Sequence, residues 1–258
     1  MDGTPLWISH RGLDAPHAEN SFNAFQAARE AGFHVLETDL RTTADGHIVL
    51  HHDPHMRRTA GQDLTVETLE RNHFLDQPLL DGQRTLAFDT FAEHFHDLPW
   101  ILDIKPESGA ATLENLMAWC RREGAHEWLM RHARFLVWNR THMTLLWRLF
   151  PEAVTMATNR ECRRAGFAVL AGTPSAAAIQ PGRTYSLPPS FLGMGLFRQR
   201  IIEQYHNRSA RVLAFLPEHR ADVERALELG VDELLVSGTA HRPGHDEQAV
   251  TRSTSYPA

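Results

Sequence analysis

Residues 34–40 read HVLETDL, a short apolar run that carries two acids near its end. Successive side chains of a strand point to opposite faces, so Leu36 and Leu40 share one face. Glu37 and Asp39 share the other face, about 6.6 Å apart along the strand. Leucines facing helices and acids facing inward near the carboxyl end are typical of a parallel barrel strand, because chemistry gathers at that end of a barrel.

Strand-like and helix-like runs alternate on both sides of this stretch, which predicts a parallel sheet covered by helices. Roughly eight strands in a chain of 258 residues favour a closed (β/α)8 TIM barrel, which typically takes about 250 residues. The expected strands are residues 5–9, 34–40, 47–51, 100–104, 135–138, 153–156, 167–170, 211–215 and 233–236. The expected helices are residues 21–30, 65–72, 88–96, 112–123, 141–150, 160–165, 198–206 and 221–229.

Local signals place the ends of the first helix. Ser21 is expected to cap its amino end, and Gly32 to stop it.

The competing architecture is an open doubly wound sheet, which usually shows G-x-G-x-x-G after its first strand, whereas residues 10–15 read HRGLDA. We therefore expect residues 1–237 to form one barrel domain. Residues 238–258 are polar and lack periodicity, and we expect them to form a mobile tail.

Charge and cysteine content narrow the possible functions. The chain has 26 basic and 32 acidic residues, a net charge of −6, so no nucleic-acid partner is expected. Two cysteines, Cys120 and Cys162, are too few for a disulfide framework or a four-thiolate zinc site. The sequence shows no run of 18 apolar residues and no basic-then-apolar leader. We therefore expect a cytoplasmic protein with no integral membrane segment.

Residues 100–105, WILDIK, repeat the arrangement of the first stretch, because Asp103 and Lys105 share one face near the end of a buried strand. Burying unpaired carboxylates costs several kcal/mol, so these acids require a cation. Carboxylate oxygens suit Mg²⁺ or Ca²⁺, which predicts one divalent cation on Glu37, Asp39 and Asp103. The alternative is that arginine or lysine holds the acids, and Lys105 could pair with them or bind an anionic substrate.

Two histidines follow strand ends in the same way. His10 ends the first strand, and His52 lies just past the run at residues 47–51. Imidazole gives and takes protons near neutral pH, so two histidines flanking a phosphate ester would form an acid–base pair. Arg11 and Lys105 would bind and polarise the phosphoryl oxygens. For either histidine, the alternative is a hydrogen-bonded structural role.

Short motifs occur in a distinctive order: HRG at residues 10–12, ETD at 37–39 and HD at 52–53. Further matching stretches are ENS at 19–21, DGHIVLHHDPHMRRT at 45–59, DIK at 103–105 and GVD at 230–232. Together they resemble the glycerophosphodiester phosphodiesterase family, over about residues 5–237.

The resemblance implies a (β/α)8 barrel that hydrolyses a small-molecule phosphodiester, a glycerophosphodiester, to glycerol 3-phosphate and an alcohol. Residues 61–83 occupy the usual place of a small inserted cap, which is short here. The implied site residues are the metal ligands Glu37, Asp39 and Asp103, the catalytic pair His10 and His52, and the phosphate-binding Arg11 and Lys105.

The chain departs from the family pattern at several strand ends. Asp103 stands where the family usually has glutamate, and its side chain is one methylene shorter, so the cation could shift or bind more weakly. Trp138-Asn139 replaces Ser-Phe, Phe215 replaces a tryptophan, and residues 237–240 read SGTA in place of Thr-Asp-x-Pro. Because the second half of the barrel lines much of the alcohol pocket, the leaving alcohol stays open, as does the oligomeric state.

A second hypothesis keeps the chemistry and changes the substrate to a lipid, as in a lysophospholipase D or a sphingomyelinase D-like enzyme. Exposed aromatic and apolar residues near the barrel mouth would favour it. The candidates lie in SFLGMGLF, residues 190–197, and are Phe191, Met194, Leu196 and Phe197. A loop folded over the barrel is the alternative explanation of these four side chains.

Two further hypotheses change the class of protein. A different metal hydrolase would use a histidine-rich site at residues 51–55, HHDPH, but it needs more histidines at later strand ends, and His51 has the strand parity that faces the helices. A catalytically degraded binding barrel is the other. A binding module has no need for both acids and histidines, so intact His10, Glu37, Asp39 and His52 weigh against it.

Overall fold

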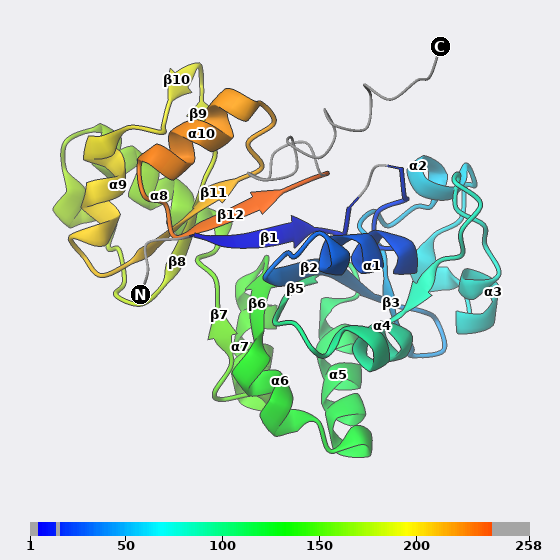
Figure 1. The fold of residues 1–258 in the computed structure, drawn as a ribbon. Helices are drawn as coiled ribbons and strands as arrows, with labels where there is room; N and C mark the ends of the chain where they lie inside the picture. The colour runs from blue at the N-terminus through cyan, green and yellow to red at the C-terminus, as the bar shows by residue number, and fades with distance from the viewer. Residues whose placement is uncertain (1–4, 14–15, 239–258) are drawn as a thin grey trace, which may run out of the picture.

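The computed structural model describes residues 5–13 and 16–238. Eight parallel strands form one curled sheet in the order β7-β6-β5-β2-β1-β12-β11-β8 (Figure 1). The segment that follows β7, an end strand, is linked to the other end strand, β8, by a backbone hydrogen bond of 3.0 Å from the Ala157 N–H to the Thr184 carbonyl. These strands are β1 (Leu6–His10), β2 (Val35–Thr42), β5 (Trp100–Ile104), β6 (Ala133–Val137), β7 (Val154–Thr155), β8 (Thr184–Leu187), β11 (Arg211–Phe215) and β12 (Glu233–Val236). The expected TIM-barrel fold is confirmed.

Helices cover the outside of this sheet, and an aromatic core lies between the two layers. Phe91 sits at its centre, with its ring 4.8 Å from that of Phe25 and 5.0 Å from that of Trp100. None of the helices in the described part of the chain has both the length and the hydrophobicity needed to cross a bilayer. The main helices are α1 (Phe22–Glu30), α4 (Phe88–Phe95), α5 (Gly109–Glu123), α6 (His126–His132), α7 (Arg140–Leu149), α8 (Asn159–Leu170), α9 (Gln199–His206) and α10 (Arg220–Glu228).

The turn between β1 and α1 is fixed by two residues. The Ser21 side chain accepts a hydrogen bond from the Ala24 N–H, which confirms it as the cap of α1. Gly12 has a φ of +84°, and a Cβ there would lie 2.6 Å from atoms of Ala24. Glycine is therefore required at this position, and the close approach holds the end of β1, with His10 and Arg11, against the start of the helix.

Strand β2 extends beyond the barrel into an antiparallel ladder with β3 (Ile48–Leu50), which in turn pairs with β4 (Leu86–Ala87). The intervening chain carries α2 (Arg57–Ala60), the 3-10 helix η1 (Val66–Thr68) and α3 (Arg71–Leu75). The expected helix at residues 65–72 is thus wrong, since the chain forms two short helical pieces there. This excursion has its own small core of Val49, Met56, Ala60, Val66 and Phe74.

One predicted barrel strand is wrong. Residues 167–170 are the last turn of α8, and the strand after that helix is β8. Thr158 and Glu161 form a capping box that starts α8, and the helix then runs for 12 residues, past the expected end at 165. The predicted tail, apart from Gly238, lies outside the described residues. A two-stranded hairpin of β9 (Ser190–Phe191) and β10 (Met194–Gly195) follows β8.

Candidate active site

Three neighbouring strands bring the predicted site residues together at their carboxyl ends. His10 of β1 pairs in register with Glu37 of β2, and Asp39 of β2 pairs with Asp103 of β5. One carboxylate oxygen from each of Glu37, Asp39 and Asp103 lies within 4.8 Å of the others. All three side chains are buried, so strand spacing correctly predicted this carboxylate cluster.

Two basic side chains partly neutralise the carboxylate cluster. Lys105 Nζ lies 2.7 Å from Asp39 Oδ1 and 2.6 Å from Asp103 Oδ2, and Arg11 Nε lies 2.9 Å from Asp39 Oδ2. Burial opposes ionisation of Asp39, but Lys105 and Arg11 hold the pKa of its carboxyl well below its ordinary value. Burial raises the pKa of Asp103 in spite of Lys105. The alternative in which basic side chains hold the acids is thus realised for these two carboxylates.

Glu37 differs from the other two acids, because no basic side chain in the described part of the chain forms an ion pair with it at hydrogen-bond distance. Its Oε2 accepts the Arg11 backbone N–H at 3.2 Å and lies 4.0 Å from His10 Nε2. Burial, with Asp39 and Asp103 nearby, raises the pKa of the Glu37 carboxyl well above its ordinary value. A cluster of three buried carboxylates with one acid short of a cation fits a hard divalent ion.

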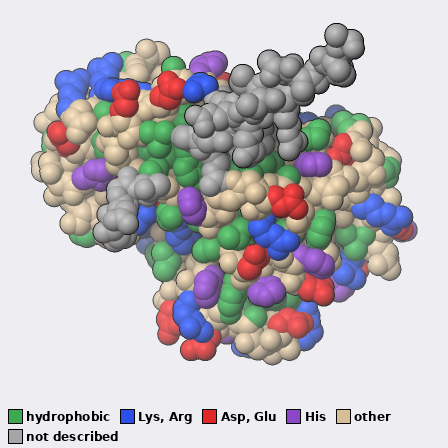
Figure 2. Space-filling view, viewed as in Figure 1, with side chains coloured by type: hydrophobic (Ala, Val, Ile, Leu, Met, Phe, Trp, Pro, Cys, Tyr) green, Lys and Arg blue, Asp and Glu red, His purple; other side chains and the backbone are tan. Residues whose placement is uncertain are grey.

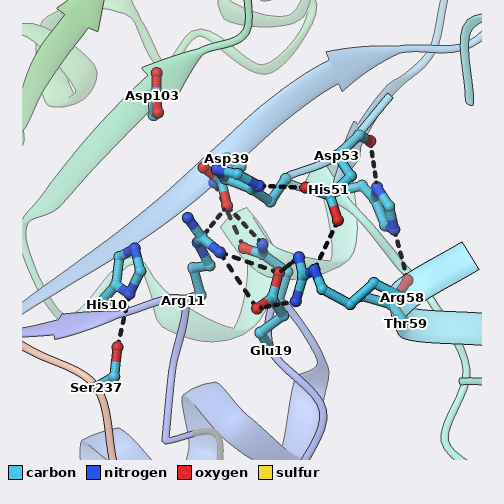
Figure 3. A network of polar contacts seen from close by, with 12 residues as sticks. His10, Arg11, Glu19, Asp39, His51, Asp53, Arg58, Thr59, Asp103 and Ser237 are labelled. Atoms are coloured by element: carbon cyan, nitrogen blue, oxygen red, sulfur yellow. Dashed lines mark hydrogen bonds and ion pairs between the residues drawn. The ribbon is translucent and has the colours of Figure 1, made fainter. Parts of the chain in front are cut away.

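His10 is largely buried beside this cluster. Its Nδ1 lies 2.8 Å from the Ser237 hydroxyl, at the end of β12 (Figure 3). Burial, with the neighbouring Arg11 guanidinium, lowers the pKa of His10 to about 3. The imidazole is therefore neutral at physiological pH and can accept a proton. Ser237, noted in the sequence only as a departure from the family pattern, thus contacts a predicted catalytic residue.

Arg11 stands at the centre of an ion-pair network (Figure 3). Its backbone has a φ of +59°, uncommon for a residue with a side chain, and its guanidinium contacts Glu19 at 3.2 Å as well as Asp39. Arg58 closes the network by contacting both Glu19 and Asp53. Glu19 and Arg58, both inside the motifs that carried the family resemblance, therefore orient side chains of this site.

Asn20 is a buried polar residue that strand spacing alone does not reveal. Its side-chain N–H donates to Asp39 Oδ2 at 2.8 Å, while its oxygen accepts the Thr38 hydroxyl at 2.9 Å. Its φ is +54°, a left-handed conformation that asparagine tolerates better than most residues. The only signal for it in the sequence is its place in the ENS stretch at residues 19–21.

His52 lies at the end of the β3 ladder and is paired with its neighbour. Its Nδ1 is 2.6 Å from Asp53 Oδ1, and because an ionised carboxylate only accepts hydrogen bonds, Nδ1 carries the proton. Partial burial opposes ionisation of Asp53, but hydrogen bonds from Arg58 and His52 bring its pKa below the ordinary value. Arg41 fixes the backbone here by donating to the carbonyl oxygens of His51 and His52.

The histidine-rich metal site is not formed. His51 is buried, with Nδ1 donating to the Asp53 carbonyl at 2.7 Å and Nε2 facing the Thr59 hydroxyl at 2.8 Å. His55 faces Thr65 instead. Among the residues that the structure describes, the carboxylate cluster is the group arranged to hold a metal ion.

Trp138 is a site residue that the sequence marked only as unusual. Its indole N–H donates to Asp103 Oδ1 at 2.6 Å, and Lys105 Nζ lies 5.7 Å from the centre of its ring. The side chain is 47% exposed, so a large part of the ring is open to solvent beside the buried cluster. Asp103, which is shorter than the glutamate usual in the resembling family, thus accepts a hydrogen bond from Trp138.

A surface hollow of about 680 Å³ lies elsewhere, between α4, α5 and α6. Its floor is aromatic, with Trp100, Trp119 and Trp128, and Trp100 stands at the amino end of β5. None of the predicted catalytic, metal or phosphate-binding residues lines it. The predicted site residues therefore lie outside this hollow.

The sequence matches the model of the glycerophosphoryl diester phosphodiesterase family over residues 10–237. Similar proteins include a probable glycerophosphodiester phosphodiesterase 2 of Mycobacterium tuberculosis, 29% identical over 46% of this chain and 45% of the relative. A glycerophosphodiester phosphodiesterase of Caldanaerobacter subterraneus is 33% identical over 40% of this chain and 46% of the relative. The human lysophospholipase D GDPD1 is 36% identical over 31% and 25%. The chain thus spans less than half the length of these relatives.

Solved structures agree on the fold. A glycerophosphoryl diester phosphodiesterase domain from Mycobacterium tuberculosis has a TM-score of 0.75 at 14% identity, covering 91% of this chain and 96% of that domain. A glycerophosphodiester phosphodiesterase from Agrobacterium tumefaciens has a TM-score of 0.72 at 18% identity, covering 91% and 97%. At these identities the likeness shows a shared architecture, which the eight-stranded barrel already displays.

Proposed function

The chain belongs to the glycerophosphoryl diester phosphodiesterase family, and from that premise we propose that it hydrolyses glycerophosphodiesters to glycerol 3-phosphate and an alcohol. The observation that carries the proposal is that His10 lies beside three buried carboxylates at the carboxyl ends of β1, β2 and β5. His52 is hydrogen-bonded to Asp53, which ion pairs through Arg58, Glu19 and Arg11 connect to Asp39. Acids for a cation and histidines for proton transfer form the minimum set that this hydrolysis needs.

We assign the cation-binding role to Glu37, Asp39 and Asp103. Their oxygens lie within 4.8 Å of one another, and the raised pKa of Glu37 reflects a carboxylate that lacks a positive partner. Mg²⁺ or Ca²⁺ held there would supply positive charge to the phosphoryl oxygens as negative charge develops on them. Lys105 and Arg11, which already contact Asp39, would bind the remaining oxygens of the phosphate.

We assign proton acceptance to His10. The Ser237 contact on Nδ1 fixes the ring so that Nε2 faces the Glu37 side of the site. A neutral imidazole can take a proton from the attacking oxygen, whether that oxygen belongs to water or to the glycerol hydroxyl of the substrate. In the second case the alcohol leaves with formation of a cyclic phosphate, which water must then open to give glycerol 3-phosphate.

We assign proton donation to His52. Asp53 accepts a hydrogen bond from the Nδ1 N–H and so fixes the tautomer, and Arg58 holds Asp53 in place. Nε2 is then the nitrogen that exchanges a proton with the leaving alcohol. Half-exposed placement of the ring suits this role, because the alcohol must leave toward solvent.

A lysophospholipid is the second candidate substrate, with the same bonds broken. It is favoured by the likeness to human lysophospholipase D GDPD1 and by the open face of Trp138 beside Asp103 and Lys105. An exposed aromatic ring at the site can contact an apolar or cationic leaving group.

Product identification tests both candidates. Purified protein is incubated with glycerophosphocholine, glycerophosphoethanolamine and a lysophospholipid, with Mg²⁺ or Ca²⁺, beside a chelated sample and the His10→Ala variant. Glycerol 3-phosphate that forms only with cation and intact His10 supports the proposal. Lysophosphatidate would move the substrate class to lipids. No product from folded, cation-loaded protein would overturn the assignment.

A further inference from the structure

At the tip of the β9–β10 hairpin lies a residue, Leu192, whose backbone conformation and exposure do not favour the stability of the fold. Leu192 and Gly193 form the two-residue turn, with φ values of +50° and +74°. Two-residue turns with both φ values positive strongly prefer Asn-Gly, because these two residues tolerate a positive φ. Leucine is strained in this conformation. The Leu192 side chain is also 77% exposed. Because Leu192 is strained and largely exposed, its side chain is available to contact a partner outside this chain.

Other apolar side chains lie beside this tip. Phe191 packs edge-on against Phe167 of α8, with ring centres 5.5 Å apart, and Phe167 and Met194 are 47% and 42% exposed. Leu196 and Phe197, which the sequence also suggested as lipid-facing, are buried in the core. The exposed apolar group is therefore smaller than expected and is centred on the hairpin and on α8.

Helix α8 adds positive charge next to these apolar residues. Arg160, Arg163, Arg164 and Phe167 follow the spacing i, i+3, i+4 and i+7, so they form one stripe, and all four are exposed. Two more exposed arginines, Arg198 and Arg200, lie at the start of α9, which packs beside α8 (Figure 1). In the described part of the chain, none of these five arginines forms an ion pair.

The charge of this part of the barrel is opposite to that of the rest. Residues 138–210 hold nine arginines against three glutamates, a balance of +6, which leaves −12 for the remainder of a chain of net charge −6. Figure 2 shows basic side chains, with acidic ones among them, at the upper left of the molecule, where Figure 1 places the hairpin, α9 and α10. Such asymmetry orients the molecule in the field of a negatively charged surface.

We propose that Arg160, Arg163, Arg164, Phe167, Leu192 and Met194 form a docking surface for an anionic lipid bilayer. The arginines would contact lipid phosphates, and the hairpin tip would enter the interface between head groups and acyl chains. Nucleic acid fits less well, because it is held by basic grooves with stacking aromatic rings and gains nothing from a strained aliphatic tip. The proposal is independent of the reaction proposed above.

Vesicle co-sedimentation tests the docking surface. The probes are vesicles of phosphatidylcholine alone and of phosphatidylcholine mixed with phosphatidylglycerol, at low and high salt. We expect binding to the mixed vesicles, weakened by salt. Arg163→Glu/Arg164→Glu should weaken it at least about 30-fold. Arg121→Glu/Arg131→Glu, on α5 and α6, makes the same change in net charge on other exposed arginines and should bind as the wild type does.

Leu192→Asn tests the apolar part without straining the turn. Asparagine is favoured in this conformation, so the variant should melt at or above the temperature of the wild type. Its vesicle binding should fall about tenfold, because a leucine side chain no longer leaves water. Heparin serves as a soluble polyanion. The proposal would be overturned if the protein bound no vesicles, or if it bound both vesicle types equally. It would also be overturned if the protein bound heparin and vesicles equally and Leu192→Asn had no effect.

Discussion

His10 and His52 have the same side chain in two different environments, and the difference supports the roles proposed for them. His10 is buried against Arg11 and neutral, whereas His52 is half-exposed and hydrogen-bonded to an ionised carboxylate. Spacing in the sequence put both at strand ends, and it already favoured His10 as the residue that activates the attacking oxygen and His52 as the residue that protonates the leaving alcohol. The structure adds the partner of each ring, since Ser237 contacts Nδ1 of His10 and Asp53 contacts Nδ1 of His52.

His52→Ala should lower kcat by about 10² or more, because proton donation to the leaving alcohol is lost. Asp53→Asn should lower kcat less, since the imidazole remains and only the contact that orients its ring is weakened. His55→Ala is the control, because that ring faces Thr65 instead of Asp53. Steady-state release of glycerol 3-phosphate measures all three. Near-native turnover by His52→Ala would remove this residue from the mechanism.

Trp138→Phe should keep the fold and weaken cation binding, because Asp103 loses the N–H that orients its Oδ1. Loss of such an outer contact typically costs about 10-fold to 100-fold in metal affinity. Titration calorimetry with Mg²⁺ or Ca²⁺ measures the change directly. The matched control is Trp147→Phe, on the exposed side of α7. Equal affinities in both variants would show that Trp138 has no part in the site.

At the scale of elements, the turns between strand and helix position the site. Strands β1, β2 and β5 were predictable, because their apolar runs end in acids or histidines. The strand after α8 was not. Residues 167–170, FAVL, look more like a buried strand than residues 184–187, TYSL, which form it. Short apolar runs do not distinguish strand from helix. Here the capping box at Thr158 starts a helix that continues through residue 167, so residues 167–170 are helical.

Gly12→Ala tests the turn after β1. The new Cβ would meet Ala24 at 2.6 Å with φ at +84°, so we expect a loss of about 3 kcal/mol in the free energy of unfolding. Gly82→Ala has nearly the same φ, +82°, with nothing within 4 Å of the new Cβ, and should cost about 1 kcal/mol. Urea denaturation measures both. Equal losses would mean that close packing of the turn on α1 is not what requires glycine.

For the molecule as a whole, burial of neutral histidines makes stability depend on pH. Burial, with nearby Arg41, lowers the pKa of His51, so its folded value lies below the value of about 6.5 in the unfolded chain. Between these values the unfolded chain binds a proton that the folded protein does not. The stabilisation is therefore complete above about pH 6.5 and is lost as the pH falls through the folded pKa.

His51→Gln removes this titration while keeping a donor for the Asp53 carbonyl. The variant should be less stable by about 1–2 kcal/mol at pH 8, because the Thr59 contact is weakened. Its free energy of unfolding should then fall less steeply than that of the wild type between pH 7 and pH 5. Urea denaturation across this range measures the slopes. Parallel slopes would show that His51 does not contribute to the acid sensitivity of the fold.

The central claim is that a divalent cation on Glu37, Asp39 and Asp103 drives phosphodiester hydrolysis. The most direct measurement is the rate of glycerol 3-phosphate release as Mg²⁺ or Ca²⁺ is returned to chelated protein, for the wild type and for Glu37→Gln. We predict saturable recovery in the wild type and at least about a 100-fold lower rate in the variant, since the cation supplies several kcal/mol of charge stabilisation. Full turnover by the chelated wild type, or an unchanged rate in Glu37→Gln, would contradict the account.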